Sequence, residues 1–300
     1  MAQTQLKKGP ERKPVFEAST SRRHGFDRVF TALVFAATVI GLVVLVVLLV
    51  DVAIDGVPLL SWQFLTGFPS TIFPETSGIY PALIGSLWLV GLTAIISVPL
   101  GIGAAVHLEE YATDSWLNRI VEINISNLAG VPSIIYGLLA LGIFVNLLRL
   151  GPSVLAGALA LSLLILPVII VATREALRSI PRAVREGGYA LGATKWEVIW
   201  GHLLPMALPG ALTGTILALS RAIGETAPLI VVGAVAFVNF TPQDPLDRYS
   251  AMPILIYGWV SEAEAEFKLL AAAGIIVLMV VLLLTNSVAI WLRNKYQRRV

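Results

Sequence analysis

The sequence predicts an all-α integral membrane protein with six transmembrane helices. The 300 residues are 57% hydrophobic and only 13% charged, with a mean hydropathy of +0.83. A single soluble core cannot bury that much apolar surface, so the surplus is expected to face lipid. Ionisable residues gather between apolar stretches that are long enough to cross a bilayer. Lys and Arg also concentrate in alternate connections, as the positive-inside rule requires of a membrane protein.

The N-terminal part predicts a basic segment followed by a retained span. Residues 1–28 carry seven Lys or Arg, and the next ionisable residue after Arg28 is Asp51. Residues 29–50 can cross the hydrocarbon core, because about 20 apolar residues suffice. A signal peptide would have a shorter basic start and an A-x-A-like cleavage site, neither of which is obvious here.

The next stretch predicts an exterior loop and a second helix. Residues 51–79 are acidic and rich in aromatic residues, Pro and Gly, with no Lys or Arg, which indicates a loop. Residues 80–106 carry no charge and predict a helix.

A third helix is predicted within residues 123–148, after a short polar connection at 109–119. This stretch contains VPSIIYG, in which Pro132 and Gly137 favour a bent helix that packs on protein rather than a smooth one that faces lipid.

The second half of the chain is divided by the same criteria. Its predicted segments are a tight turn at 149–153, a fourth helix at 154–173, a polar loop at 174–205, a fifth helix at 206–236, an acidic loop at 237–268, a sixth helix at 269–292 and a basic tail at 293–300. Within the acidic loop, residues 251–260 are apolar but too short to span, and we expect them at the membrane interface.

The basic residues predict the topology. Six helices place 17 Lys or Arg on one side and 3 on the other, with Arg221 inside the fifth helix. By the positive-inside rule, both termini and the loop at 174–205 are cytoplasmic. Five or seven helices would leave a basic end outside.

Several kinds of chemistry have no basis in this sequence. The absence of cysteine excludes disulfides, thiolate metal sites and a cysteine nucleophile. The three histidines show no metal-ligand spacing. Lys195 lies two positions too late after Gly192 for a phosphate-binding P-loop. We expect no catalytic site, no metal, no cofactor and no nucleic-acid partner.

The polar loop at 174–205 predicts a helix-turn-helix. Pro181 can begin a helix, and Ala190 and Gly192 are small enough for a tight corner. Apolar side chains recur at helical spacing at Tyr189, Trp196, Ile199 and Trp200. A solvated linker is the alternative, but two exposed tryptophans favour a docking surface for another protein.

The fifth helix carries small and charged residues on one face. At 100° per residue, one stripe about 80° wide contains Gly210, Gly214, Ala218, Arg221 and Glu225. Such a stripe is expected to face another helix or a water-filled path, because charges avoid lipid.

Arg221 and Glu225 are spaced i,i+4 and can pair. Pro228 cannot donate to the carbonyl of Gly224, which leaves a further acceptor nearby. The pair has two interpretations: a structural ion pair, or a gate or anion contact on a translocation path. A guanidinium suits phosphate, since it is planar and always charged.

Motifs in these two regions resemble known transporters. Glu186, Gly192, Leu204 and Pro205 keep the spacing E-x5-G-x11-L-P, which resembles the cytoplasmic loop of binding-protein-dependent ABC importer permeases. The family's E-A-A is Glu186-Gly187-Gly188 here, and its usual isoleucine is His202. SRAIGETAP (220–228) and NLAGVPSIIYG (127–137) resemble permeases of phosphate-specific (Pst) importers, and the Ala-Pro after Gly-Glu-Thr favours the PstA type over its PstC partner.

The resemblance covers about residues 80–292 and implies a type I ABC importer permease core. It implies that the chain is not an enzyme but a permease subunit in the bacterial inner membrane, which forms half of a phosphate path containing Arg221 and Glu225. The implied partners are a second permease (PstC-like), ATPase subunits (PstB-like), an exterior phosphate-binding protein (PstS-like) and lipid. The loop that would contact the ATPase contains Glu186, Gly192, Ala193, Trp196, Leu204 and Pro205.

Three alternatives remain at this point. The same machine could import another oxyanion, such as molybdate or sulfate. An ion-coupled secondary carrier could use the charged pair, although we find no inverted repeats of broken helices. A purely structural membrane anchor would not explain a charged pair in mid-membrane.

Overall fold

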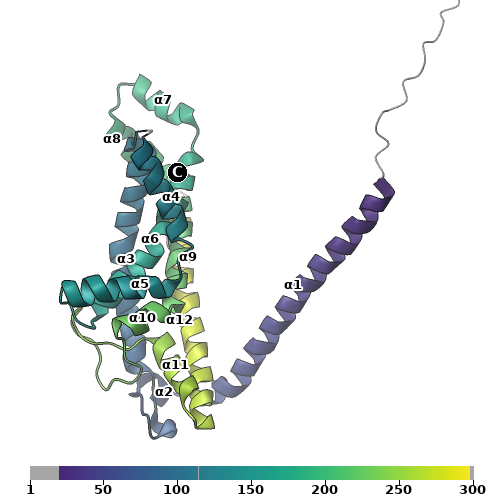
Figure 1. Ribbon diagram of the computed structural model, residues 1–300, viewed down its shortest axis with the longest axis vertical. Helices are drawn as coiled ribbons and strands as arrows, with labels where there is room; N and C mark the ends of the chain where they lie inside the picture. Colours follow the sequence, from purple (N-terminus) through teal and green to yellow (C-terminus); the bar gives the residue numbers. More distant parts are fainter. Residues whose placement is uncertain (1–19, 114, 298–300) are drawn as a thin grey trace, which may run out of the picture. The chain divides into compact units, whose positions relative to one another are not determined.

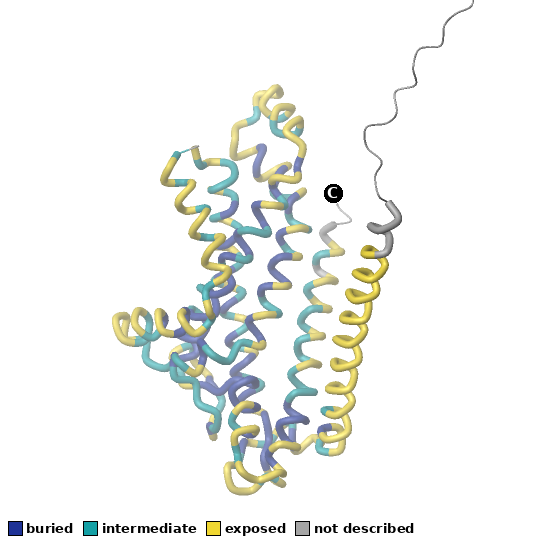
Figure 2. The backbone as a smooth tube through the Cα atoms, turned by 45° about the vertical axis from the view of Figure 1, so that its right-hand side comes forward, coloured by how far each residue is buried: buried dark blue, intermediate teal, exposed yellow. Residues whose placement is uncertain are grey.

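The computed structural model describes residues 20–113 and 115–297, in which all regular structure is helical. The chain divides into two compact units, residues 1–51 and 52–300. Helix α1 (Thr20–Gly56) makes up the described part of the first unit and ends just inside the second, and the apolar window of this helix is exposed along its whole length (Figure 2). Residues 1–19 of the predicted N-terminal segment and 298–300 of the predicted tail lie outside the described residues.

Five helical segments of the described chain are long and apolar enough to cross a membrane, and a bent pair of helices makes a possible sixth. The prediction of an all-α protein is therefore confirmed, and the predicted number of six helices is reached when the bent pair is counted as one span. Most segments are longer than predicted, because the helices continue beyond the apolar residues. Their bounds are Phe26–Leu59, Tyr80–Tyr111, Val154–Arg178, Lys195–Gly224 and Ala265–Lys295.

The third predicted helix is broken rather than bent. It consists of α4 (Trp116–Leu128) and α5 (Ser133–Ala140), and α5 runs on into a π-helical segment, Leu141–Leu147. The two parts meet at 110° (Figure 1). Pro132 caps α5 in an extended conformation, since proline has no N–H to continue a helix. The Tyr136 hydroxyl donates to the carbonyl of Leu128 at 2.7 Å and bridges the break.

The prediction of one fifth helix over 206–236 is wrong at both ends. Helix α8 (Lys195–Val198) and a π-helical segment, Ile199–Leu203, lead directly into α9 (Leu204–Gly224). The chain is extended at Glu225 and restarts as α10 (Ala227–Val232). Pro228 lies in the first turn of α10, where a missing N–H costs nothing.

Helix α6 (Val154–Arg178) is the centre of the second unit, with α3 (Tyr80–Val106) and α9 packed along it. The α6–α9 contact is close because α9 presents glycines. A Cβ added to Gly214 would lie 2.1 Å from the Cβ of Ala172, and one added to Gly210 would lie 2.6 Å from that of Ala176. Such small-residue contacts allow two helix backbones to approach each other.

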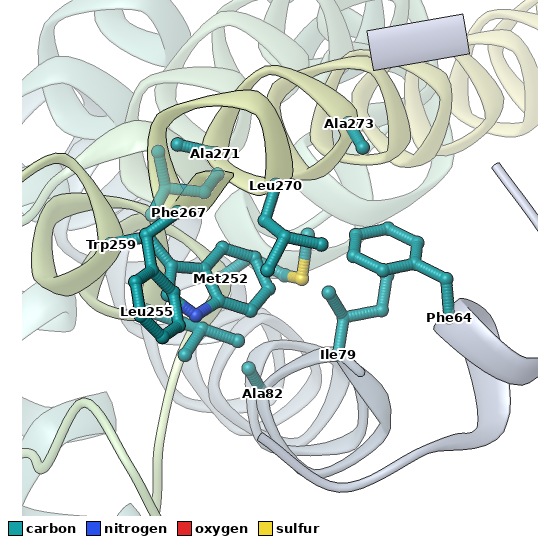
Figure 3. Close-up of a cluster of buried hydrophobic side chains, with 11 residues drawn as sticks. Phe64, Ile79, Ala82, Met252, Leu255, Trp259, Phe267, Leu270, Ala271 and Ala273 are labelled. Carbon is teal, nitrogen blue, oxygen red and sulfur yellow. The ribbon is translucent and has the colours of Figure 1, made fainter. Parts of the chain in front are cut away.

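The end of this unit that carries α2 and α11 has its own apolar core (Figure 3). Helix α11 (Met252–Ser261) contributes the fully buried Trp259, and α12 (Ala265–Gln297) contributes Phe267. The apolar segment at 251–260 is therefore helical and packs into the protein, while its place at a membrane interface stays a prediction. Because α12 starts at Ala265, the predicted acidic loop is shorter than 237–268.

The remaining short elements connect these helices. They are a 3-10 turn at Val57–Leu59, α2 (Trp62–Thr66), a 3-10 turn at Pro74–Thr76 and a π-helical segment at His107–Tyr111 that prolongs α3. In the loop before α11, the backbone N–H groups of Gln243 and Asp244 donate to the carboxylate of Asp247 and hold its pKa below its usual value. The carbonyl of Asp247 accepts from Val154 N–H at 3.0 Å, which ties this loop to the start of α6.

Candidate functional site

The charged pair predicted in the fifth helix is present. Nε of Arg221 lies 3.1 Å from Oε1 of Glu225, so the predicted pairing is confirmed. Its setting differs from the prediction, because α9 ends at Gly224 and Glu225 is the residue that caps it. The pair therefore closes a helix end beside a break in the span, where backbone polar groups are also available.

The predicted stripe divides into two parts. Gly214 and Ala218 are buried, and Gly214 presses on α6. Arg221 lies outside that contact, with 47% of its side chain exposed, while Glu225 is 17% exposed. Within the described part of the chain, the two Nη groups of Arg221 make no hydrogen bond. Those donors are available to solvent or to another partner, and a guanidinium presents them as a planar fork.

A link between α9 and α12 lies next to this arginine. The hydroxyl of Ser220 is 2.6 Å from Oδ1 of Asn286, and it also lies 2.7 Å from the carbonyl of Ile216. Polar contacts of this kind join helices where no water is present. The link was not predicted, because the sequence gives no spacing rule for partners on separate helices.

The predicted helix-turn-helix at 174–205 is also present. Its first helix is α7 (Arg182–Ala190), and its second is α8, which begins with a capping box between Thr194 and Glu197. Gly192 forms the corner with φ +82°, and a Cβ there would have no atom within 4 Å. Backbone conformation, rather than lack of space, is therefore the reason for a glycine at this corner.

The predicted contact residues of this loop do not form a single surface. Glu186 is exposed on α7 and, with Tyr189, lines a cleft of about 540 Å³. Trp196 stacks on Trp200 with ring centroids 5.4 Å apart, and both line a second, largely apolar cleft against α3. Ile199, predicted to supply an apolar contact at the same helical spacing, lines this cleft too and is buried in an apolar cluster.

The other predicted residues occupy the base of the loop. Ala193 is partly buried against the apolar cluster that contains Leu177 and Leu203. Leu204 and Pro205 start α9, and both are partly buried. They can position the loop but present little surface to a partner.

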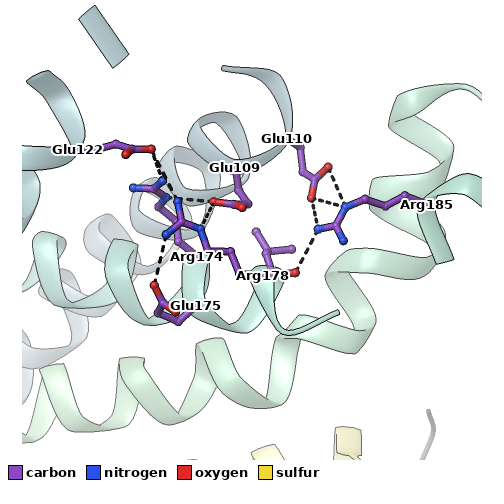
Figure 4. A network of polar contacts seen from close by, with 8 residues as sticks. Glu109, Glu110, Glu122, Arg174, Glu175, Arg178 and Arg185 are labelled. Carbon is purple, nitrogen blue, oxygen red and sulfur yellow. Dashed lines mark hydrogen bonds and ion pairs between the residues drawn. The ribbon is translucent and has the colours of Figure 1, made fainter. Parts of the chain in front are cut away.

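A network of ion pairs near the loop was not predicted (Figure 4). Glu109 at the end of α3 lies 2.9 Å from Nε of Arg178 and 3.4 Å from Nε of the buried Arg174 on α6. Arg174 also pairs with Glu122 of α4. The network therefore joins the end of α3, the last turns of α6 and the middle of α4.

The sequence did contain a signal for this network. The connection at 109–119 and the loop at 174–205 were both predicted on the same side of the membrane, one acidic at its start and the other basic. Opposite charges at neighbouring helix ends are expected to pair, but the sequence alone does not say which ends are neighbours.

Apolar helices long enough to cross a membrane, and a helix-turn-helix between two of them, are the features of a polytopic membrane protein. Residues 97–300 match the family described as binding-protein-dependent transport system inner membrane component, and the chain belongs to this family. It is accordingly a multi-pass permease subunit of the ABC transporter class, and membership implies ATPase and binding-protein partners.

Curated relatives match over most of their length. The chain is 35% identical to the phosphate transport system permease protein PstA 1 of Mycobacterium tuberculosis (strain CDC 1551 / Oshkosh), covering 97% of this chain and 96% of that one. It is 34% identical to the phosphate transport system permease protein PstA of Yersinia pestis, covering 88% of each. It is 33% identical to the probable ABC transporter permease protein YqgI of Bacillus subtilis (strain 168), over 91% and 97% of the two chains.

Solved structures show the same fold at lower identity. A chain of a bacterial ABC transporter that imports the acidic polysaccharide alginate matches with a TM-score of 0.66 and 17% identity, over 93% of this chain and 99% of that one. A chain of the inward-facing MetNI methionine ABC transporter matches with a TM-score of 0.56 and 18% identity, over 73% and 97%.

Proposed function

We propose that this chain is the PstA-type permease subunit of an ATP-driven phosphate importer and forms half of the translocation path. The observation that carries the proposal is the near full-length similarity to PstA-named permeases, together with the uncommitted guanidinium of Arg221 at a break in a span. In this proposal Glu225 holds Arg221 as a counter-charge until the path opens. Phosphate then replaces the carboxylate as the partner of the arginine.

ATP is hydrolysed by a separate subunit in this proposal, and the chain itself is not an enzyme. Helix α7 and its corner at Gly192 form the ATPase contact, with Glu186 exposed on the helix. Trp196 was grouped with this contact on sequence grounds. Its position against α3 supports a role at the edge of the docking site instead.

The complete importer contains a second, PstC-like permease, PstB-like ATPase subunits and an exterior PstS-like phosphate-binding protein. Both termini and the loop at 174–205 face the cytoplasm, which the split of 17 to 3 basic residues supports. The exposed side of Arg221 would then face the second permease across the path.

Copurification and uptake test the proposal together. The chain, solubilised in mild detergent from cells that express all four components, should bring down the ATPase and the second permease. Liposomes that contain the purified complex should accumulate labelled phosphate only with ATP and the binding protein. A chain that copurifies with neither partner, or a complete complex that does not take up phosphate, would overturn the proposal.

The same assay separates the alternatives. Labelled molybdate and sulfate should not be taken up at concentrations that saturate phosphate uptake, and preferential uptake of either would assign the importer to that oxyanion. Uptake that persists without ATP would indicate an ion-coupled carrier. Family membership already argues against that carrier.

A further inference from the structure

One ion pair joins the docking helix α7 to the membrane helices. Nη2 of Arg185 lies 2.6 Å from Oε1 of Glu110, and Nε of Arg185 lies 3.1 Å from the same oxygen (Figure 4). Glu110 belongs to the π-helical segment that prolongs α3. Within the described residues, Arg185 is the only member of α7 that forms an ion pair.

Arg185 also holds the end of α6 and the turn that follows it. Its Nη1 donates to the carbonyl of Ile180 at 3.1 Å, and its Nη2 donates to that of Leu177 at 3.1 Å. Carbonyls at the end of a helix have no partner within the helix and need one from elsewhere. A single guanidinium therefore ties together α7, the end of α6 and the extension of α3.

The pair is shielded from water, unlike most ion pairs at a protein surface. The Arg185 side chain is 19% exposed and that of Glu110 is 6% exposed. Two hydrogen bonds from one guanidinium to one carboxylate, shielded from solvent, fix the orientation of the two side chains relative to each other. A carboxylate left without its partner in such a place would be costly, so the contact is expected to persist while the helices move.

The other contacts of α7 are mostly apolar. The backbone of α7 approaches mainly α8 and the π-helical segment Ile199–Leu203, which follow it in the same loop. Val184 packs against an apolar cluster that residues at the ends of α3 and α6 share. The neighbouring network of ion pairs links the end of α3 to α6 without including α7. The polar and directional route from the docking helix to α3 therefore runs through Glu110 and Arg185.

We infer that Glu110 and Arg185 are positioning residues that transmit the movement of the docked α7 to α3 and α6 during transport. The inference rests on the proposed function, in which α7 contacts the ATPase. A push on α7 reaches α3 through the carboxylate and α6 through the two carbonyls. Without the pair, α7 would still dock, but its displacement would be absorbed in the loop.

Glu110→Gln is the decisive variant, because it removes the charge while Arg185 keeps its bonds to the carbonyls. The complete complex in liposomes is assayed for ATP hydrolysis and for phosphate uptake, with both rates normalised to assembled complex. We expect hydrolysis close to the wild-type rate and about tenfold less phosphate moved per ATP, the ratio that corresponds to one charge-assisted hydrogen bond. Glu110→Asp, which keeps the charge, should recover part of the loss.

Glu175→Gln is the matched control. Glu175 lies in the same region, but its partner Arg178 is three residues away on the same helix, so the pair links no two elements. This variant should keep the wild-type number of phosphates per ATP.

The outcomes are distinguishable. A wild-type ratio in Glu110→Gln would overturn the inference, as would an equal loss in Glu175→Gln. Failure of Glu110→Gln to assemble would also overturn it, because the pair would then only hold the loop together. A wild-type complex that does not take up phosphate would instead overturn the proposed function.

Discussion

Arg221 and Glu225 are paired across the end of α9, with Nε and Oε1 3.1 Å apart, and the arginine is much the more exposed of the two. The carboxylate holds only one nitrogen of the guanidinium, and the Nη groups make no hydrogen bond within the described residues. Carboxylate–guanidinium pairs frequently use two parallel hydrogen bonds, and this one leaves the rest of the fork open. This asymmetry favours a role for Arg221 beyond structure.

The first prediction separates these roles with a double variant. Arg221→Gln with Glu225→Gln removes both charges, so no unpaired charge is left within the membrane. We expect normal assembly but phosphate uptake reduced at least about tenfold, since the amide lacks the fixed charge and the fork of donors. Uptake is measured per assembled complex, and uptake at the wild-type rate would leave the pair with a structural role only. Arg221→Lys keeps the charge without the fork and should transport at an intermediate rate.

The second prediction concerns the corner at Gly192. Because φ is +82° and the surrounding space is open, the cost of a side chain there is conformational, about 1–2 kcal/mol for most residues and less for Asn. Gly192→Val should weaken copurification of the ATPase, whereas Gly192→Asn should retain most of it. Equal loss in both variants would mean that a side chain at this position collides with the ATPase itself.

The third prediction concerns the contact between α6 and α9. Gly214→Ala places a methyl group 2.1 Å from the Cβ of Ala172, so the helices must separate, at a cost of about 1–3 kcal/mol. The melting temperature of the purified protein in detergent should fall. Gly103→Ala on α3 is the control, because nothing lies within 4 Å of the added carbon, and it should leave the melting temperature unchanged or raise it slightly. If Gly103→Ala lowered the melting temperature more than Gly214→Ala, the packing of α9 against α6 would not be what stabilises α9.

The fourth prediction tests the orientation in the membrane. Single cysteines can be introduced into this chain without background, because it has none. An impermeant thiol reagent added outside should label Leu60→Cys and Pro245→Cys, and should reach Lys195→Cys and position 15 only after the membrane is opened. Ala158→Cys is a buried control that should stay unlabelled on both sides. Labelling of position 195 from outside would contradict the orientation.

Most transmembrane helices could be predicted, because a span is recognised from an apolar stretch long enough to cross the hydrocarbon core. The failures fall where a helix stops inside an apolar stretch. At Pro132 the sequence signal was seen, but a bent helix and a complete break of 110° give the same signal in the sequence. At Glu225 the signal was Pro228, which was interpreted as leaving a free carbonyl within one helix, because a helix continued through the apolar residues 227–236 would have been equally hydrophobic.

The candidate site was predictable to the extent that its partners are close in sequence. Arg221 and Glu225 follow the i,i+4 rule, so their contact could be foreseen. Arg185 and Glu110 are 75 residues apart, and only the packing of α3 beside α6 brings them together. The π-helical segment Ile199–Leu203 was not predicted either, because its wider turn departs from the 3.6-residue period by which helices are recognised.

The two motifs noted in the sequence, VPSIIYG and SRAIGETAP, meet in the structure at one point. A Cβ on Gly137 of α5 would lie 2.7 Å from the Cα of Pro228 in α10, so backbone touches backbone there. A residue larger than glycine at position 137 would push α10 away from α5. The two positions are therefore expected to change together or not at all in the history of this protein, although 91 residues separate them. The position of α10, which follows the charged pair, therefore depends on a glycine in α5.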